Sequence, residues 1–196
     1  GGGGAGKLAP TVSAPPPPNW QPQGPENCAL FPVRRGTPEF NAVRDNMAKT
    51  MPDADNQIVK VERIQNRMLW DYYCMRRRRM TKLARGKDLA EESVWHGTSK
   101  HDPATIFRDE QDGFMMQHCV KGMWGRGLYF AENASYSDRY SHELGDTDER
   151  SFLLAKLLVG DSVHIMPNDS SLAMCPDKPD GGRYDTVTGE TRGSKV

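Results

Sequence analysis

The stretch Gly125–Tyr140, with the sequence GRGLYFAENASYSDRY, carries the most information about the fold of this chain. It opens with closely spaced glycines and continues through the apolar run Leu128–Ala131, which predicts a short strand. Asn133 can then cap a helix that runs to about Tyr140. Ser137 and Tyr140 are three residues apart on that helix, so a hydroxyl and an aromatic ring share one face. The stretch therefore predicts a strand that leads directly into a short helix.

A nucleotide-binding loop is the first function that closely spaced glycines suggest. Gly122, Gly125 and Gly127 follow the order GxxGxG, and the residues after them predict a strand. The phosphate-binding fingerprint of dinucleotide-binding folds instead requires GxGxxG at the start of a helix. These glycines therefore do not indicate a Rossmann site.

A second predicted strand, Val94-Trp95, ends at His96-Gly97-Thr98. Gly97 has no Cβ atom, so its N–H and C=O could closely approach a planar carboxamide. His96 and Thr98 flank this point and could bind sugar hydroxyls. Taken alone, a histidine is more often a structural group than a catalyst. Its position beside a glycine at a strand end makes it a candidate binding residue.

Tyr129 lies in the predicted strand that adjoins the helix of Ser137 and Tyr140. A tyrosine beside a phenylalanine in a strand is usually a core residue. If Tyr129 and Tyr140 instead face one volume, each ring contributes about 1 kcal/mol of stacking beyond burial. Together with Gly97, the two rings predict a cleft for a flat aromatic ring that carries an amide.

The rest of the chain alternates predicted helices and strands, which favours an α+β fold. Residues after Gly160 are rich in proline and glycine and predict mostly loop. The predicted helices are residues 39–51, residues 66–83 with Asn66 as the cap, and a short helix from Asp102-Pro103 that stops at Gly113. The further predicted strands lie within residues 58–64 and 152–159.

Length and composition indicate one folded domain. The 196 residues are 36% hydrophobic, which is enough for one ordinary core. Residues 1–19 are rich in glycine and proline and are expected to be a disordered leader, and residues 20–196 form the folded domain. Pro15–Pro18 favours a polyproline II ligand or a plain spacer, and the spacer is the favoured interpretation.

Charge and cysteine content exclude several classes of protein. The 26 basic and 26 acidic residues cancel, so no net field draws the chain to nucleic acid or anionic lipid. The four cysteines form no CxxC pair, which favours a reducing compartment, the nucleus or the cytoplasm. No apolar run reaches membrane-spanning length, so no membrane contact is expected. No HExxH motif or carboxylate cluster is present, and no metal site is expected.

The basic run Arg76–Arg79 lies on the second predicted helix. A solvated helix face is the favoured interpretation, and a contact with phosphate or nucleic acid is the alternative. An RNA-binding domain would need aromatic residues interleaved with these arginines and an excess of positive charge. The sequence has neither feature near this run.

At the residues described above, the sequence resembles the poly(ADP-ribose) polymerase catalytic domain, the diphtheria-toxin-like branch of the ADP-ribosyltransferases, from about Trp20 to the end. The resemblance is greatest to macrodomain-associated, mono-ADP-ribosylating members. It implies an ADP-ribosyltransferase fold, in which two packed, mainly antiparallel sheets flanked by short helices form an NAD⁺ cleft. The blocks that agree, in order, are KVERIQNRMLWDYY (60–73), WHGT (95–98), GRGLYFAENASYSDRY (125–140), FLLAKLLVG (152–160) and YDTVTGE (184–190).

This resemblance implies that NAD⁺ is the substrate and that ADP-ribose passes to protein acceptors with release of nicotinamide. It implies that His96 and Tyr129 are catalytic, as the first two members of a His-Tyr-Glu triad. The histidine would hold a ribose hydroxyl, and the tyrosine would stack on nicotinamide. The NAD⁺-binding positions that the resemblance implies are His96, Gly97, Thr98, Tyr129, Phe130, Ala131, Ser137 and Tyr140.

The same resemblance assigns finer roles within this set. Gly97 pairs with the carboxamide through its backbone, Ser137 donates to it, and Tyr140 stacks from the opposite side. Thr98 corresponds to the residue that touches the adenosine ribose. Residues 114–124 correspond to a donor loop that lines the NAD⁺ site.

The third triad position is expected at or beyond Val196, in a strand that this sequence does not complete. Glu190 is the nearest acidic residue and is expected in the loop before that strand. Tyr136 stands where polymerising members often have lysine, which favours transfer of single units. A poly(ADP-ribose) polymerase and an inactive reader of NAD⁺ or ADP-ribose remain the alternatives, and the oligomeric state stays open.

Overall fold

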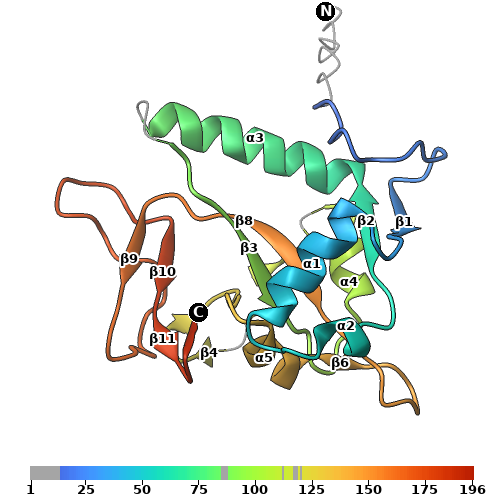
Figure 1. The fold of residues 1–196 in the computed structure, drawn as a ribbon. Coiled ribbons are helices and arrows are strands. Elements are labelled where there is room, and N and C mark those ends of the chain that lie inside the picture. Colours follow the sequence, from blue (N-terminus) through green and yellow to red (C-terminus); the bar gives the residue numbers. More distant parts are fainter. Residues whose placement is uncertain (1–13, 85–87, 112, 117–118, 120) are drawn as a thin grey trace, which may run out of the picture.

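A pair of antiparallel strands at the centre of the fold carries the residues that the sequence singles out (Figure 1). The computed structural model describes residues 14–84, 88–111, 113–116, 119 and 121–196. Strand β3 (Glu91–His96) pairs with β8 (Leu153–Leu158), with Val94 opposite Ala155 and His96 opposite Leu153. Both strands were predicted from their apolar runs, and both predictions are confirmed.

The predicted strand at residues 128–131 is reduced to one bridge on the free edge of β3. Trp95 and Ala131 exchange two backbone hydrogen bonds, of 2.8 and 2.9 Å. The next residue, Glu132, donates its N–H to Lys195 O instead of continuing along β3. The prediction of a strand is therefore wrong, because the chain turns away after a single pair of bonds.

Helix α1 (Pro38–Ala48) confirms the first predicted helix. The Thr37 side chain caps it by accepting from Phe40 N, and proline occupies its first turn. Phe40 and Met47 are buried on its inner face, where they join a core cluster with Trp95 of β3. The short helix α2 (Ala54–Gln57) follows. The strand expected within residues 58–64 begins only at Glu62, as β2, and residues 58–61 connect α2 to it without regular structure.

Strand β2 (Glu62–Asn66) pairs antiparallel with β1 (Cys28–Pro32) and leads into the long helix α3 (Arg67–Leu83). The predicted cap is confirmed, since Asn66 Oδ1 accepts from Leu69 N at 3.0 Å. Arg76–Arg79 are exposed, as expected for a solvated face. Arg76 and Arg77 make ion pairs with Asp185 and Glu91.

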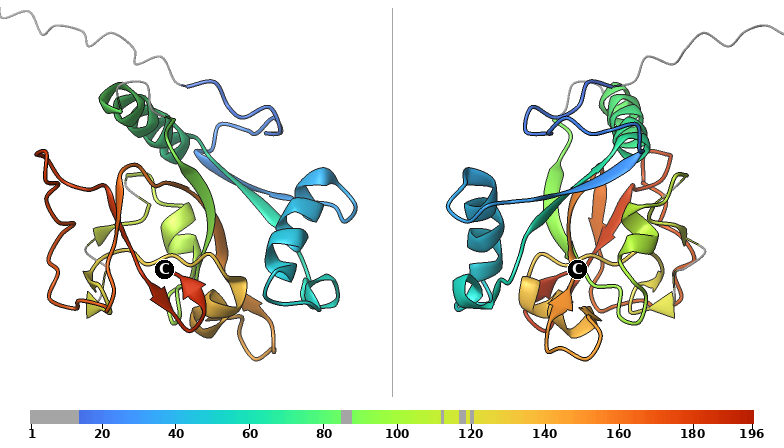
Figure 2. Two further views of the ribbon diagram at one scale, coloured as in Figure 1. Left: turned by 60° about the vertical axis from the view of Figure 1, so that its left-hand side comes forward. Right: turned by 90° about the vertical axis from the view of Figure 1, so that its right-hand side faces the viewer.

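The chain from Ala14 to Pro25 runs beside the first turns of α3 (Figure 2). Of the leader expected at residues 1–19, residues 1–13 lie outside the described residues. Ala14 N donates to Asp71 Oδ1 at 2.8 Å, and Trp20 packs against Trp70 with 6.0 Å between ring centroids. Residues 14–20 therefore have defined contacts with the domain.

Short elements form the remainder. The helix predicted from Asp102-Pro103 is α4 (Ala104–Phe107), which ends six residues before the predicted stop at Gly113. Its N-cap is Pro103, and Asp102 Oδ1 accepts from Ala104 N at 2.8 Å. The residues after Gly160, predicted mostly as loop, contain four short strands, of which β9 and β10 pair in parallel. The bounds of these elements are β4 (Lys121–Gly122), β5 (Gly125–Arg126), α5 (Ala134–Ser137), the 3₁₀ helix η2 (Asp138–Tyr140), β6 (His142–Glu143), β7 (Arg150–Ser151), β9 (Ser162–His164), β10 (Thr186–Thr188), β11 (Glu190–Thr191) and β12 (Ser194–Lys195).

The architecture is thus α+β and mainly antiparallel, as predicted. In place of the two packed sheets that were expected, the described residues form six two-stranded sheets, of which β9–β10 is the parallel one. Among the residues described, no helix is both long and apolar enough to cross a membrane.

Candidate functional site

His96 ends β3, and its ring is held from several sides. Its Nδ1 atom lies 2.7 Å from the carbonyl oxygen of Tyr129. Because a carbonyl oxygen only accepts, Nδ1 carries the proton of this bond. Burial lowers the pKa of His96, and the backbone bond offsets this only in part. The ring is therefore neutral near pH 7, and Nε2 is an unprotonated acceptor.

Two phenylalanines fix the plane of this ring. Phe114 meets His96 edge to face, with centroids 5.0 Å apart and planes at 87°, and Phe130 lies at 5.2 Å. The sequence placed Phe114 at the start of a loop and did not single it out. Only its position seven residues before the glycine-rich hairpin could have suggested a role, and this signal is weak.

Gly97 brings the end of β3 against the helix of Ser137 and Tyr140. A Cβ atom at position 97 would lie 2.3 Å from Tyr140 O and 2.8 Å from Ser137 O, so no side chain fits there. Ser99 N donates to the same Tyr140 oxygen at 2.6 Å. The structure therefore brings together His96-Gly97-Thr98 and Ser137–Tyr140, two segments that the sequence separates by about forty residues.

The side chains on the two segments differ in exposure. Ser137 is buried and Thr98 is nearly so, and the Thr98 hydroxyl donates to His101 O at 2.5 Å. Tyr140 is 44% exposed, and one edge of its ring contacts Tyr136 with 5.6 Å between centroids. Burial, together with a hydrogen bond to Tyr140, raises the pKa of Tyr136 to about 12. Tyr140 thus has an accessible side chain, and its main-chain carbonyl lies against Gly97.

Tyr129 is fixed by the hairpin of β4 and β5. Its hydroxyl donates to Gly125 O at 2.8 Å and accepts from Trp124 N at 2.9 Å. A Cβ atom on Gly122 would come within 2.6 Å of the ring, so the hairpin approaches closely only because glycine stands there. Burial raises the pKa of Tyr129, which keeps the phenol protonated.

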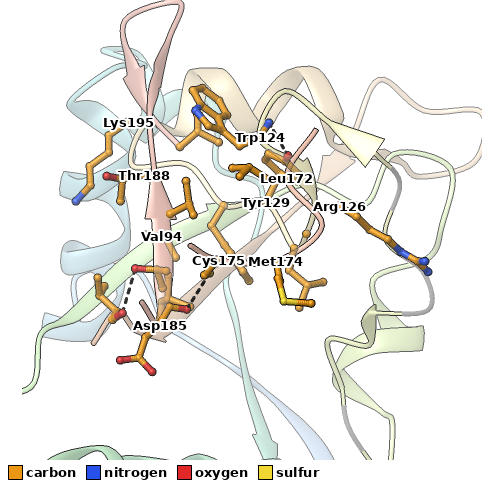
Figure 3. A pocket seen from close by; sticks show the side chains of 18 of the residues that line it. Val94, Trp124, Arg126, Tyr129, Leu172, Met174, Cys175, Asp185, Thr188 and Lys195 are labelled. Atoms are coloured by element: carbon orange, nitrogen blue, oxygen red, sulfur yellow. Dashed lines mark hydrogen bonds between the residues drawn. The ribbon is translucent and has the colours of Figure 1, made fainter. Parts of the chain in front are cut away.

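A cavity of about 450 Å³ lies on the Tyr129 side (Figure 3). Its walls come from β3, β8, β10 and the hairpin and are mainly apolar. Tyr129 and Phe130 line it, whereas its described walls do not include His96, Gly97, Ser137 or Tyr140. Near it, Lys195 Nζ donates to Glu92 Oε1 at 2.9 Å. The predicted site residues therefore fall into two neighbouring parts, which the backbone of Tyr129–Ala131 joins.

Of the two parts, we take the one at Gly97 and Tyr140, and not the cavity, as the candidate site. The cavity offers mostly hydrocarbon, whereas Gly97 and Tyr140 present main-chain and aromatic groups beside a neutral imidazole. Within the described part of the chain, no three His, Cys, Asp or Glu side chains lie close enough to hold a metal ion.

Comparison with known proteins gives consistent matches. A family model described as the poly(ADP-ribose) polymerase catalytic domain matches residues 37–192. A probable poly(ADP-ribose) polymerase of Dictyostelium discoideum is 35% identical over 137 residues, which cover 68% of this chain and 40% of the relative.

Two human relatives are named as mono-ADP-ribosyltransferases. Human protein mono-ADP-ribosyltransferase PARP11 is 28% identical over 204 residues, which cover 93% of this chain and 58% of the relative. Human protein mono-ADP-ribosyltransferase PARP12 is 37% identical over 129 residues, which cover 64% of this chain and 17% of the relative. The chain thus spans less than two thirds of the length of each of these relatives.

Proposed function

This chain belongs to the poly(ADP-ribose) polymerase catalytic-domain family, and from that membership we propose that it is an NAD⁺ ADP-ribosyltransferase that attaches single ADP-ribose units to protein acceptors. The matched residues 37–192 include every residue of the candidate site. The names of the PARP11 and PARP12 relatives favour transfer of single units over polymer formation. Tyr136, where polymerising members often have lysine, agrees with this choice.

The NAD⁺ cleft of this proposal lies between the end of β3 and η2 and extends toward Tyr129. The observation that carries it is the direct packing of Gly97 against the main chain of Ser137 and Tyr140. This packing brings Tyr140, whose side chain is 44% exposed, to the end of β3. A flat ring with a carboxamide at its edge suits such a surface.

The chemistry of the side chains fits the nicotinamide and ribose parts of NAD⁺. Because His96 Nδ1 donates to Tyr129 O, Nε2 carries a lone pair, and a sugar hydroxyl can donate a hydrogen bond to Nε2. Tyr140 offers a ring for stacking, and the phenol of Tyr129, in the neighbouring part of the site, stays neutral because burial raises its pKa. Ser137 supplies a hydroxyl donor from the helix that Gly97 contacts.

NAD⁺ itself supplies a cationic leaving group. In the proposed reaction, the bond between the ribose C1′ atom and the nicotinamide nitrogen breaks, and its electron pair leaves with nicotinamide. A nucleophilic side chain of the acceptor forms the new bond to C1′ and loses its proton. The protein holds the ring and the ribose in place, since catalysis requires interactions that are stronger in the transition state than with bound substrate.

The role of His96 in this proposal is to hold the ribose, because a neutral imidazole that has already used its N–H has no proton to give. The two phenylalanines around it keep Nε2 at a fixed position. Positioning of this kind lowers a barrier by removing unproductive orientations before the reaction.

The test is incubation of the chain with NAD⁺ labelled on the adenine or its ribose, followed by electrophoresis. We expect one labelled protein band of nearly unchanged mobility, and loss of the label in His96→Ala. A ladder of slower bands would overturn single-unit transfer in favour of a polymerase. NAD⁺ binding without transfer of label would overturn the enzyme and favour a reader of NAD⁺ or ADP-ribose.

A further inference from the structure

A row of three aromatic rings lies on α3, and the proposed transferase reaction uses none of them. Trp70 and Tyr73 are three residues apart on one face of the helix, with ring centroids 5.6 Å apart and planes within 18°. Trp20 lies against Trp70 from the N-terminal segment, with 6.0 Å between centroids. The Tyr73 hydroxyl donates to Glu91 at 2.5 Å, which fixes the end of the row to β3. We call Trp20, Trp70 and Tyr73 the aromatic row.

The aromatic row forms the wall of a groove of about 200 Å³. The rings leave part of their faces accessible, since all three residues are only partly buried. The groove floor is also largely apolar, with Ile64 and Leu69 beneath the rings and Lys156 at one side. A rigid, apolar ligand with few polar groups to desolvate fits a groove of this kind.

The chain's own proline-rich segment, Ala14–Pro18, contacts the edge of this surface at Trp70 and Asp71, and its residues do not line the groove itself. The Trp70 indole Nε1–H donates to Pro15 O at 2.9 Å, and Ala14 N donates to Asp71 Oδ1 at 2.8 Å. The segment then turns, with Trp20 N donating to Pro17 O at 3.0 Å, and the turn returns Trp20 onto the Trp70 ring. Ala14 is buried, whereas Pro15, Pro16 and Pro18 are exposed.

We propose that the aromatic row is a recognition surface for proline-rich segments, and that the chain's own Ala14–Pro18 is held at its edge through Trp70 and Asp71. Four consecutive prolines favour the extended polyproline II conformation and have no N–H to donate. Their carbonyl oxygens therefore accept hydrogen bonds from donors outside the segment. Grooves lined by aromatic rings bind such segments in other proteins, with little loss of chain entropy. Trp70 combines both functions, because its ring lines the groove and its N–H donates to a carbonyl before the next proline.

The contacts of Ala14 define the start of the recognised motif. Asp71 accepts from the N–H of the residue that precedes the first proline, so a proline at that position would lose the bond. The side chain at that position is buried, so it must be small. The surface is therefore expected to select a small residue followed by prolines.

The segment is held lightly compared with the residues that follow it. Two hydrogen bonds join Ala14 and Pro15 to α3. Gln21, by contrast, exchanges two hydrogen bonds of 2.8 Å with the fully buried side chain of Gln65. Ala14–Pro18 can therefore leave the surface while Trp20 and Gln21 stay anchored, and a proline-rich segment of a partner protein takes its place.

The test uses the whole chain and the indole N–H signals of its tryptophans in nuclear magnetic resonance spectra. The Trp70 signal is assigned by its loss in Trp70→Phe. In the variant Pro15→Ser, Pro16→Gly, Pro17→Ser, Pro18→Gly, we expect this signal to move while those of Trp95 and Trp124 stay. The latter two report that the fold is intact.

A synthetic peptide of residues 11–19 (TVSAPPPPN) is then added to this variant. We expect saturable binding that returns the Trp70 signal toward its original position. In the unaltered chain, the peptide must compete with Ala14–Pro18, so its apparent affinity is expected to be at least tenfold weaker. In the proline variant, Trp70→Phe should weaken peptide binding at least tenfold, as followed by the indole signal of Trp20, and Tyr72→Phe, on the exposed side of α3, should not.

Several results would overturn the proposal. A Trp70 signal that does not move when the prolines are replaced would show that the segment is not docked. Equal peptide affinity in the unaltered chain and the variant would exclude exchange. A peptide with serine in place of each proline that binds equally well would exclude recognition of proline. Because none of these readouts involves NAD⁺, they are independent of the transferase assay.

Discussion

The main chain of Gly97 lies directly against the carbonyl group of Tyr140, where a Cβ atom would come within 2.3 Å of the oxygen. This contact joins the end of β3 to η2 and creates the candidate NAD⁺ site. It follows that residue 97 has two reasons to be glycine: the fold requires it, and the proposed carboxamide contact uses its main chain.

Replacement of Gly97 by alanine is therefore expected to destabilise the protein. Overpacking against main chain costs about 3 kcal/mol, which for a domain of this size lowers the melting temperature by roughly 6–12 °C. Thermal unfolding measures the change. Gly127→Ala is the matched control, because its Cβ would meet Tyr129 at an ordinary 3.9 Å. Equal melting temperatures for the two variants would contradict the contact.

Replacement of Tyr140 by alanine is expected to weaken nicotinamide-site ligands while leaving the fold intact. The ring is 44% exposed, so little core packing is lost. Loss of its stacking and burial should cost about 1.5–3 kcal/mol, or roughly tenfold or more in affinity for a benzamide-type ligand. Calorimetric titration gives the affinity. Tyr72→Ala, which is 42% exposed on α3, is the control and should bind as the unaltered chain does.

The affinity for NAD⁺ should fall as the solution is acidified. Burial holds the pKa of His96 below its ordinary 6.5, so Nε2 remains an acceptor at neutral pH. Protonation below the lowered pKa removes that acceptor and with it the proposed ribose contact. We expect a constant dissociation constant above pH 6.5 and a rise on the acid side. In His96→Gln, this acid-side step should be absent, and its persistence would assign the titration to another group.

The burial of His96 also makes the free energy of unfolding depend on pH in a defined direction. Because the folded protein binds the His96 proton less tightly than the unfolded chain does, the unfolded state carries more protons between the two pKa values. The free energy of unfolding should therefore decrease as pH falls from 6.5 toward the lowered pKa and level off below it. Urea unfolding of the protein and of His96→Gln measures this difference. A larger free energy at the lower pH would contradict the burial of a neutral ring.

Gln65 is expected to stabilise the protein by holding the N-terminal segment at Gln21. It is fully buried and bonds both the N–H and the C=O of Gln21. Gln65→Leu leaves these groups without partners, at a cost of about 1–3 kcal/mol for each buried group. Chemical denaturation should show a loss of about 2 kcal/mol or more. Gln57→Leu, at an exposed position, should change stability by less than about 0.5 kcal/mol.

Elements with a strong local pattern could be predicted from the sequence. α1 was found from apolar residues at helical spacing, α3 because the capping residue Asn66 and helical spacing agree, and β3 and β8 because apolar runs end at turns. Strand partners were not predictable at residues 128–131, since pairing there depends on Lys195, far away in the chain. The two-residue strands of the hairpin at β4 and β5 depend on a positive φ at Gly125 and on the approach of Tyr129, which no periodicity encodes.

The candidate site was predictable to a similar degree. The proximity of Gly97 to Ser137 and Tyr140 follows the pattern of the family, and the structure brings these residues together. The contact of the Phe114 ring with His96 and the contact of Tyr129 with the hairpin depend on tertiary packing, which a single motif does not specify. The contact of Pro15 with Trp70 was unpredictable for the same reason, since a run of prolines carries no periodicity.

The position of a bound nicotinamide mimic tests the account most directly. A crystal structure of the protein soaked with benzamide is predicted to show the ring against Tyr140, with the carboxamide on the main chain of Gly97. Benzamide in the apolar cavity between Trp124 and Leu157, with the surface at Gly97 and Tyr140 bare, would contradict the account.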